Sequence, residues 1–135
     1  MKSVLYDTNV ILNVLLKREP YFLASAGALD AVAHGKVKGY ISGHTITTFA
    51  YLLQRKLGSA KTRTVLAGFL SKMLVAPVTD ASIRQALVGK FSDFEDAVTH
   101  AAAREAGVSL IITRNIRDFS NAEIPVILPE LFLVN

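Results

Sequence analysis

The chain has 135 residues, of which 51% are hydrophobic and 19% charged, and it contains no cysteine. Its length suits a single domain over 1–135, and its apolar content excludes a disordered chain. The lack of cysteine excludes disulfides and thiolate metal sites, while 15 basic against 11 acidic residues give a net charge of +4, which favours a polyanionic partner.

The first half of the chain alternates short apolar runs with longer amphipathic segments. The elements predicted here are a strand over 4–6, helices over 9–17 and 21–34, a strand over 39–42, and helices over 45–57 and 59–74. Glu19-Pro20, Gly35 and Gly58 are the expected breaks between these helices, and Ser59 is the expected N-cap of the segment after Gly58.

The second half continues the alternation. The elements predicted here are a strand over 75–78, helices over 80–88 and 92–107, strands over 109–113 and 124–128, and a last turn of helix or loop over 129–133. Asp80 and Ser92 are the expected N-caps of the two helices. Ser92 and Glu95 also fit a capping box, which gives Glu95 a structural role.

The predicted strands are continuous apolar runs, which is typical of a parallel sheet covered on both faces. We therefore predict an α/β fold, a three-layer α/β/α sandwich with a central, mostly parallel sheet of four to five strands and right-handed crossovers. In such folds ligands bind at the carboxyl ends of the strands.

Four acidic residues fall where this rule places a site. Asp7 directly follows the first strand, and Asp118 follows the strand that ends at Thr113. Asp93 and Asp96 lie three residues apart in the first turn of a predicted helix, so they share one face. Carboxylates gathered at one point repel each other unless a cation offsets their charge, and Mg²⁺ or Mn²⁺ suits oxygen ligands.

Each of these acids also has a purely structural interpretation. Asp7 would cap the first helix, and Asp93 and Asp96 would complement the helix dipole. Asp118 would pair with Arg114, four residues before it. Taken together, however, the four acids leave 15 basic against 7 acidic residues elsewhere, and an acidic pocket in a basic shell suits a metal-dependent enzyme that acts on phosphodiesters.

Three stretches of the chain resemble a known family. The opening Asp7-Thr8-Asn9-Val10-Ile11-Leu12 is similar to the start of PIN-domain nucleases, which include the VapC toxins of toxin–antitoxin pairs. The stretch Asp93-Phe94-Glu95-Asp96-Ala97 and the later Ile111-Ile112-Thr113-Arg114-Asn115-Ile116-Arg117-Asp118-Phe119 are similar to the family's second half. The order and spacing run almost end to end, so the resemblance covers nearly the whole chain.

This resemblance implies a site of three or four acidic residues that binds Mg²⁺ or Mn²⁺ and cuts RNA. Asp7 matches the first acid of the family and Asp96 the third, while either Asn115 or Asp118 matches the fourth. Asp93 would assist them. The catalytic residues expected are Asp7, Asp96, Asp118, Asn115 and Asp93, the metal ligands Asp7, Asp96 and Asp118, and the substrate-binding residues Thr8, Asn9, Thr48, Arg114 and Arg117.

The chain departs from the family at one position. The family usually has a glutamate shortly after the second strand, and our alignment places Thr48 there. No acid occurs between Asp30 and Asp80, so a shift of register does not recover it. A threonine hydroxyl carries no charge, although it can hold a metal-bound water.

Basic and aromatic residues outside this site suggest how RNA would be held. Arg55, Lys56, Lys61 and Arg63 would form a groove for its backbone or a solvated corner between two helices, and Tyr51 would stack a base or belong to the core. His44, near the carboxyl end of the second strand, would lie at the site or hydrogen-bond at a helix entry, and His100, four residues after Asp96, would touch substrate or pack.

These inferences lead to two hypotheses. The first is a metal-dependent endoribonuclease, the toxin of a type II toxin–antitoxin pair, with RNA such as tRNA or mRNA, an antitoxin protein and a second copy of itself as partners. The second is a degenerate PIN module that binds RNA or a protein without cleaving. We expect a cytoplasmic protein without membrane contact, because no apolar run reaches about 18 residues and Asp7, Asn9 and Asn13 interrupt the N-terminal apolar stretch.

Overall fold

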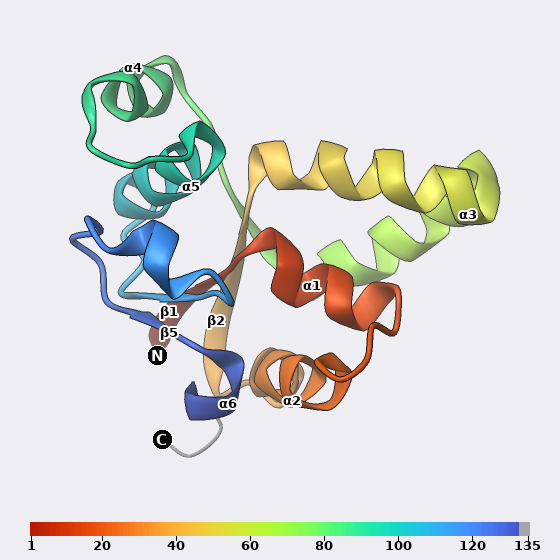
Figure 1. Ribbon diagram of the computed structural model, residues 1–135. Coiled ribbons are helices and arrows are strands. Elements are labelled where there is room, and N and C mark those ends of the chain that lie inside the picture. The colour runs from red at the N-terminus through yellow and green to blue at the C-terminus, as the bar shows by residue number, and fades with distance from the viewer. Residues whose placement is uncertain (133–135) are drawn as a thin grey trace.

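The computed structural model of the protein describes residues 1–132. Five strands form one sheet in the order β3-β2-β1-β4-β5, and every neighbouring pair is parallel (Figure 1). The strands are β1 (Lys2–Tyr6), β2 (Val37–Ser42), β3 (Leu74–Ala76), β4 (Leu110–Ile112) and β5 (Val126–Ile127). This confirms the predicted parallel sheet, with the larger of the two expected strand numbers.

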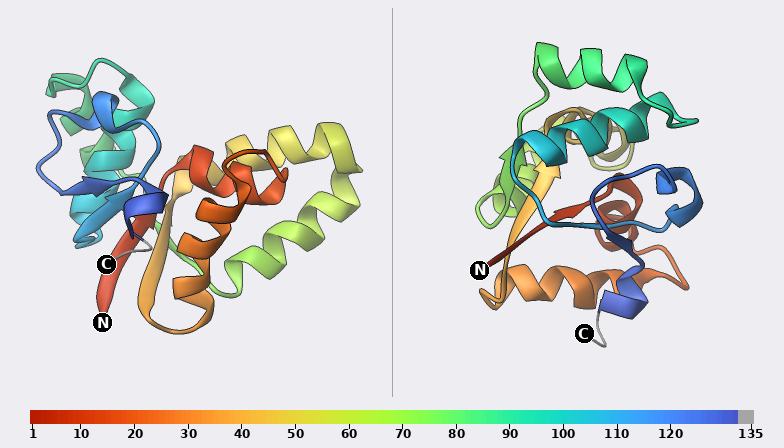
Figure 2. Two further views of the ribbon diagram at one scale, coloured as in Figure 1. Left: turned by 60° about the horizontal axis from the view of Figure 1, so that its bottom comes forward. Right: turned by 90° about the vertical axis from the view of Figure 1, so that its left-hand side faces the viewer.

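Helices cover both faces of the sheet, as predicted. They are α1 (Thr8–Leu15), α2 (Phe22–Ala33), α3 (Gly43–Leu70), α4 (Asp80–Val88), α5 (Phe94–Glu105) and α6 (Pro129–Phe132), with a short 3-10 helix η1 (Ile116–Phe119). The right-hand view of Figure 2 shows α5 and α4 on one side of the sheet and α2 on the other. No helix within residues 1–132 is long and apolar enough to cross a membrane.

The central strand β1 shows how the sequence builds two cores. Val4 and Tyr6 join the cluster on the side of α1, α2 and α3, which also contains Phe49. Leu5, between them, joins the cluster on the side of α5, which contains Ala102. Successive side chains of a strand point to opposite faces, so a continuous apolar run feeds both layers at once.

Helix α3 contains the break predicted at Gly58, whose φ of 79° and ψ of 168° interrupt the helical backbone. Glycine adopts this positive φ without the steric cost that a Cβ would add. The two helical segments, before and after Gly58, form a hairpin that projects from the rest of the molecule (left-hand view of Figure 2). The predicted end of the second segment at Leu74 is wrong, since α3 ends at Leu70 and Leu74 begins β3.

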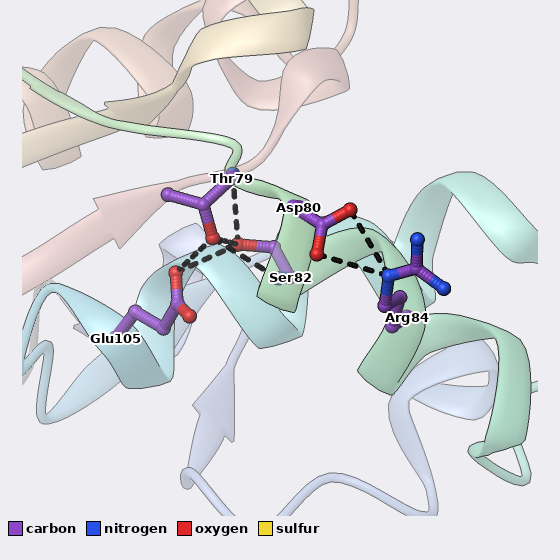
Figure 3. Close-up of polar contacts among 5 residues, drawn as sticks. All are labelled: Thr79, Asp80, Ser82, Arg84 and Glu105. Atoms are coloured by element: carbon purple, nitrogen blue, oxygen red, sulfur yellow. Dashed lines mark hydrogen bonds and ion pairs between the residues drawn. The ribbon is translucent and has the colours of Figure 1, made fainter.

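The predicted N-cap of α4 is wrong by one residue. Thr79 caps the helix by accepting a hydrogen bond from the Ser82 backbone N–H at 3.1 Å, and Asp80 instead binds Arg84 at 2.9 Å (Figure 3). The hydroxyls of Thr79 and Ser82 also donate to the Glu105 carboxylate, each at 2.8 Å. Thr79 and Asp80 are both good caps, so the contact with α5 decides between them.

The predicted cap of α5 is also wrong by one residue, and this matters for the site. Asp93 is the N-cap in place of Ser92, and it accepts a hydrogen bond from the Asp96 backbone N–H at 3.0 Å. Glu95 is therefore the second residue of the helix, and the expected capping box with Ser92 is absent. The side chain of Glu95 has no capping role to perform.

Candidate active site

The order of the strands creates a crevice beside β1. The connections through α1 and α2 lead from β1 to β2 on one side of it, whereas the later connection through α4 and α5 leads to β4 on its other side. Ligands bind outside the carboxyl ends of strands where the chain reverses in this way. Asp7 follows β1 at this point, and its backbone N–H donates to the Ile112 carbonyl of β4 at 2.9 Å.

A cavity of about 390 Å³ opens at this crevice. Segments that lie far apart in the sequence contribute side chains to it: α1 with the residue before it, the loop after α1, the first segment of α3, the start of α5 and the chain after β4. The lining residues are Asp7, Thr8, Asn9, Leu12, Arg18, Thr48, Leu52, Asp93, Glu95, Asp96, Asn115 and Asp118. The structure therefore brings together the predicted acids and four of the six other predicted residues, while Arg114 and Arg117 lie outside the lining.

Asp7 is held in place from both sides. One carboxylate oxygen accepts the Thr8 backbone N–H at 2.9 Å, and the other accepts the Thr113 hydroxyl at 2.8 Å. Burial raises the pKa of Asp7 and the charge of Glu95 adds to this, although the two hydrogen bonds act in the opposite direction. Asp7 is thus the N-cap of α1 and a cavity residue together, so its two interpretations are compatible.

Asp96 carries the strongest sign of crowded charge. Its side chain is 8% exposed and belongs to the first turn of α5. Burial, followed by the charges of Asp7, Asp93, Asp118 and Glu95, raises its pKa from 3.8 to about 7. Asp96 therefore binds a proton, or requires a cation, near neutral pH.

The cavity contains two charged residues that the sequence analysis missed as site residues. Glu95 was assigned to a capping box, yet it lines the cavity and raises the pKa of both Asp7 and Asp96. Arg18 was not considered, and it is the basic residue among those that line the cavity. Moving the α5 cap from Ser92 to Asp93 is the signal that would have found Glu95, whereas no sequence pattern marked Arg18.

Thr48 and Leu52 form the side of the cavity that α3 contributes. Thr48 lines it, as the alignment with the family predicted for this position, and its hydroxyl is 3.5 Å from the His44 carbonyl. One turn earlier, the Thr45 hydroxyl hydrogen-bonds the Thr8 hydroxyl at 3.1 Å. This side therefore supplies neutral oxygen atoms.

Arg114 lies beside the cavity and outside its lining. Its guanidinium donates to Asn13 at 2.7 Å, to both oxygens of Glu130 at 3.0 and 2.9 Å, and to Ser25 at 2.9 Å. It also stacks over the Tyr21 ring at 4.4 Å. These contacts tie the chain after β4 to α1, α2 and α6, which points to a structural role in place of the substrate-binding role expected for Arg114.

Three other residues singled out from the sequence are Arg117 in η1 and the two histidines His44 and His100. Arg117 is exposed, and its guanidinium forms no hydrogen bond or ion pair within residues 1–132, which leaves its charge available. His44 bridges the Ser42 hydroxyl at 2.8 Å and the Thr99 hydroxyl at 3.3 Å. His100 accepts the Glu123 backbone N–H at 3.0 Å, so both histidines have hydrogen-bonding roles outside the cavity lining.

The atoms of the cavity that could ligate a metal ion are oxygens, which suit a hard cation. Within residues 1–132 no group of three or more His, Asp or Glu side chains lies close enough together to hold a metal ion by itself. Mg²⁺ can bind without three protein ligands, because it commonly retains several waters and binds through one or two carboxylates together with substrate phosphates. The residues therefore fit a partly hydrated Mg²⁺ or Mn²⁺.

Comparison with known proteins places the chain among PIN domains. A family model described as a PIN domain matches residues 3–117. A chain of the VapBC2 complex from Rickettsia felis, bound to a promoter DNA fragment, is similar with a TM-score of 0.70 and 14% identity over 93% of this chain and 98% of that one.

Two further solved structures are similar. A toxin–antitoxin complex from Klebsiella pneumoniae gives a TM-score of 0.69 and 22% identity over 93% of this chain and 97% of that one. VapC20 from Mycobacterium tuberculosis, described as a Sarcin-Ricin loop cleaving toxin, gives a TM-score of 0.65 and 17% identity over 90% of this chain and 98% of that one. No curated protein matched the chain. At these identities the likeness concerns the fold.

Proposed function

The chain belongs to the PIN domain family, and we propose that it is a metal-dependent endoribonuclease. The observation that carries this proposal is the gathering of Asp7, Asp96 and Asp118 at one cavity, where burial and the repulsion between carboxylates together raise the pKa of Asp96 to about 7. Such an arrangement costs free energy unless it binds a cation. A purely structural role for these acids gives no reason to place them together.

Asp7 and Asp96 are the residues that would hold Mg²⁺ or Mn²⁺ directly, with Asp118 acting through water. A bound divalent cation would supply a water of lowered pKa and stabilise the leaving oxygen of a phosphodiester. The hydrogen bonds from Thr8 and Thr113 fix the Asp7 carboxylate before any ligand arrives. This rigidity reduces the ordering that binding would otherwise require.

The neighbouring residues would position the metal ligands, orient water and hold the phosphate backbone. Asp93 fixes the start of α5 and so the position of Asp96, while Asn115 and Thr48 offer neutral oxygen atoms that can orient a water. Asn9 and Thr8 lie at the start of α1, whose positive dipole end favours a phosphate. Arg18 at the cavity and Arg117 beside it are the cations proposed to hold the RNA backbone.

The similar toxin–antitoxin complexes support a second level of the proposal: that this nuclease is the toxin of a type II pair, with an antitoxin protein as partner. We also propose a homodimer. Exposed apolar side chains on α4 and at the start of α5, namely Leu87, Val88 and Phe94, provide surface for a protein partner. Sedimentation of the purified chain tests the dimer.

Cleavage of a mixed RNA pool by the purified protein tests the activity. We expect fragments with Mg²⁺ or Mn²⁺ present, none with excess EDTA, and none with Asp96→Asn under either condition. A matched control is Asp80→Asn, which removes the same charge from the exposed surface of α4. Cleavage that persists in EDTA, or in Asp96→Asn, would refute the metal-dependent mechanism.

Thr48 favours one alternative, a PIN module that binds RNA or a protein partner without cleaving. This residue lines the cavity at the position where the family resemblance implies a glutamate, and its hydroxyl cannot supply a charge. Calorimetric titration with Mn²⁺ separates the two functions. Binding that Asp96→Asn removes supports the nuclease, whereas an acidic cavity that binds no metal supports the alternative.

A further inference from the structure

The longest stretch without an acidic residue forms the projecting hairpin and its approaches. Residues 31–79 contain seven basic and no acidic residues, although the whole chain has a net charge of only +4. Four of the seven, Arg55, Lys56, Lys61 and Arg63, lie on α3 near Gly58. All four are exposed and form no ion pair within residues 1–132, so their field is uncompensated.

The first segment of α3 connects this charge to the cavity. Thr48 and Leu52 line the cavity, and Tyr51, Arg55 and Lys56 follow at spacings of three and four residues on the same side of the helix. The large buried side chains of this segment, Phe49 and Leu53, belong to the core, and the buried Thr45 hydrogen-bonds Thr8 of α1. At about 1.5 Å per residue, Arg55 lies about 10 Å along the helix from Thr48.

Tyr51 and Arg55 form a pair suited to an unpaired base. Tyr51 is 63% exposed, which is unusual for so large a side chain. The Arg55 guanidinium lies over its ring at 5.9 Å from the centroid. An aromatic ring and a guanidinium plane next to a basic stripe are the surfaces on which single-stranded nucleic acids stack and bind.

We infer that the first segment of α3 is the binding track for a single-stranded part of the RNA that leaves the cavity, with a base on Tyr51 and phosphates on Arg55 and Lys56. This inference rests on the proposed function, because it takes RNA to be the substrate. It assigns the surface that receives the substrate: an unpaired strand on one side of the scissile bond would pass along α3. A duplex at this position has no free base face for Tyr51.

The experiment measures the affinity of a short, labelled single-stranded RNA by fluorescence anisotropy, in the Asp96→Asn background so that no cleavage occurs. Arg55→Gln/Lys56→Gln should weaken binding about tenfold at about 0.1 M salt, and the slope of log K against log salt should fall by about 1.4. The matched control is Lys36→Gln/Lys38→Gln, which removes two exposed charges from the same acid-free stretch near the opposite ends of the strands. The RNA affinity of this control should stay within twofold of the Asp96→Asn parent.

A second pair of variants tests stacking without changing charge. Tyr51→Leu should weaken binding about tenfold, while Tyr51→Phe retains the ring and should stay within twofold. All these positions are exposed, so thermal melting should match the Asp96→Asn parent. Equal losses in the two double variants, or equal effects of Leu and Phe, would overturn the track.

The outcomes separate this inference from the proposed function. Wild-type protein that cleaves RNA while Arg55→Gln/Lys56→Gln keeps full affinity overturns the track alone. Protein that binds through α3 and never cleaves overturns the nuclease and supports the track. If the double variant keeps its RNA affinity and instead loses binding to vesicles of anionic lipid, the hairpin serves a membrane surface and the track is overturned.

Discussion

Replacing Asp96 with asparagine tests the central physical claim, because the substitution should remove activity and increase stability together. Asparagine keeps the shape of the side chain and removes its charge. The residue is 8% exposed, and its carboxylate is repelled by Asp7, Asp93, Asp118 and Glu95. The folded protein therefore holds this charge at a cost that the variant avoids.

The magnitude follows from the pKa. In the folded protein the pKa of Asp96 is about 7, against 3.8 for an ordinary aspartate. Because the folded pKa is raised, the folded state gains stability from the bound proton, fully below pH about 4, and loses it as the pH rises through about 7. At about 1.4 kcal/mol per unit of pKa the loss is at most about 4 kcal/mol, and screening by water in the open cavity reduces it to about 1–2 kcal/mol.

Thermal unfolding of metal-free protein at several pH values measures this difference. At pH 8, Asp96→Asn should melt about 4–8 °C above the wild type, at about 4 °C per kcal/mol for a chain of this length. At pH 4 the two should coincide. Added Mn²⁺ at about 100 times its Kd should stabilise the wild type alone, by about 2.7 kcal/mol.

Asp80→Asn removes one exposed charge from α4 and should change stability by less than about 0.5 kcal/mol at every pH, with RNA cleavage retained. The reasoning fails if Asp96→Asn is less stable than the wild type at pH 8, or if Mn²⁺ stabilises both proteins equally. Loss of cleavage with no gain in stability would mean that the acids do not crowd one another.

Further substitutions test the parts around Asp96. Thr48→Glu adds a carboxylate to the cavity and should raise Mn²⁺ affinity at least about tenfold in calorimetry, and unchanged affinity would mean that α3 does not face the ion. Thr113→Val removes the hydroxyl that donates to Asp7, so urea unfolding should show a loss of about 1–3 kcal/mol; a neutral result would contradict the role of that bond. Arg114→Ala should lower the free energy of unfolding by about 2–4 kcal/mol, because it loses hydrogen bonds to several elements. Arg117→Ala should leave the free energy of unfolding unchanged and weaken RNA binding. The reverse pattern would mean that Arg114 binds RNA and Arg117 is structural.

Local pattern in the sequence was sufficient to predict the layered parallel sheet. Continuous apolar runs such as Val4-Leu5-Tyr6 can be buried only between two layers, so they predict helices on both faces. The breaks at Gly35 and Gly58 were also predictable, because both residues adopt a positive φ, at 69° and 79°, that other residues avoid. The N-caps of α4 and α5 were not, since adjacent residues there are equally good caps.

The position of the first acid could likewise be predicted. Asp7 ends an apolar strand, and the carboxyl ends of parallel strands share one edge of a sheet. The resemblance to PIN domains then linked Asp7 to Asp96 and Asp118. That Arg18 and Glu95 also reach the cavity could not be predicted from spacing, because the loop after α1 and the first turn of α5 meet only when the sheet has formed.

The sequence by itself therefore determined the α/β architecture and the family, and it predicted Asp7, Asp96 and Asp118 as candidate site residues. Only the tertiary structure decided that Glu95 joins the acids, that Arg114 is committed to Glu130 and Asn13, and that Tyr51 stays exposed next to Arg55. The reason is that apolar periodicity acts between neighbours along the chain. The charge felt by one carboxylate depends instead on distances in space, which the strand order and the helix starts fix.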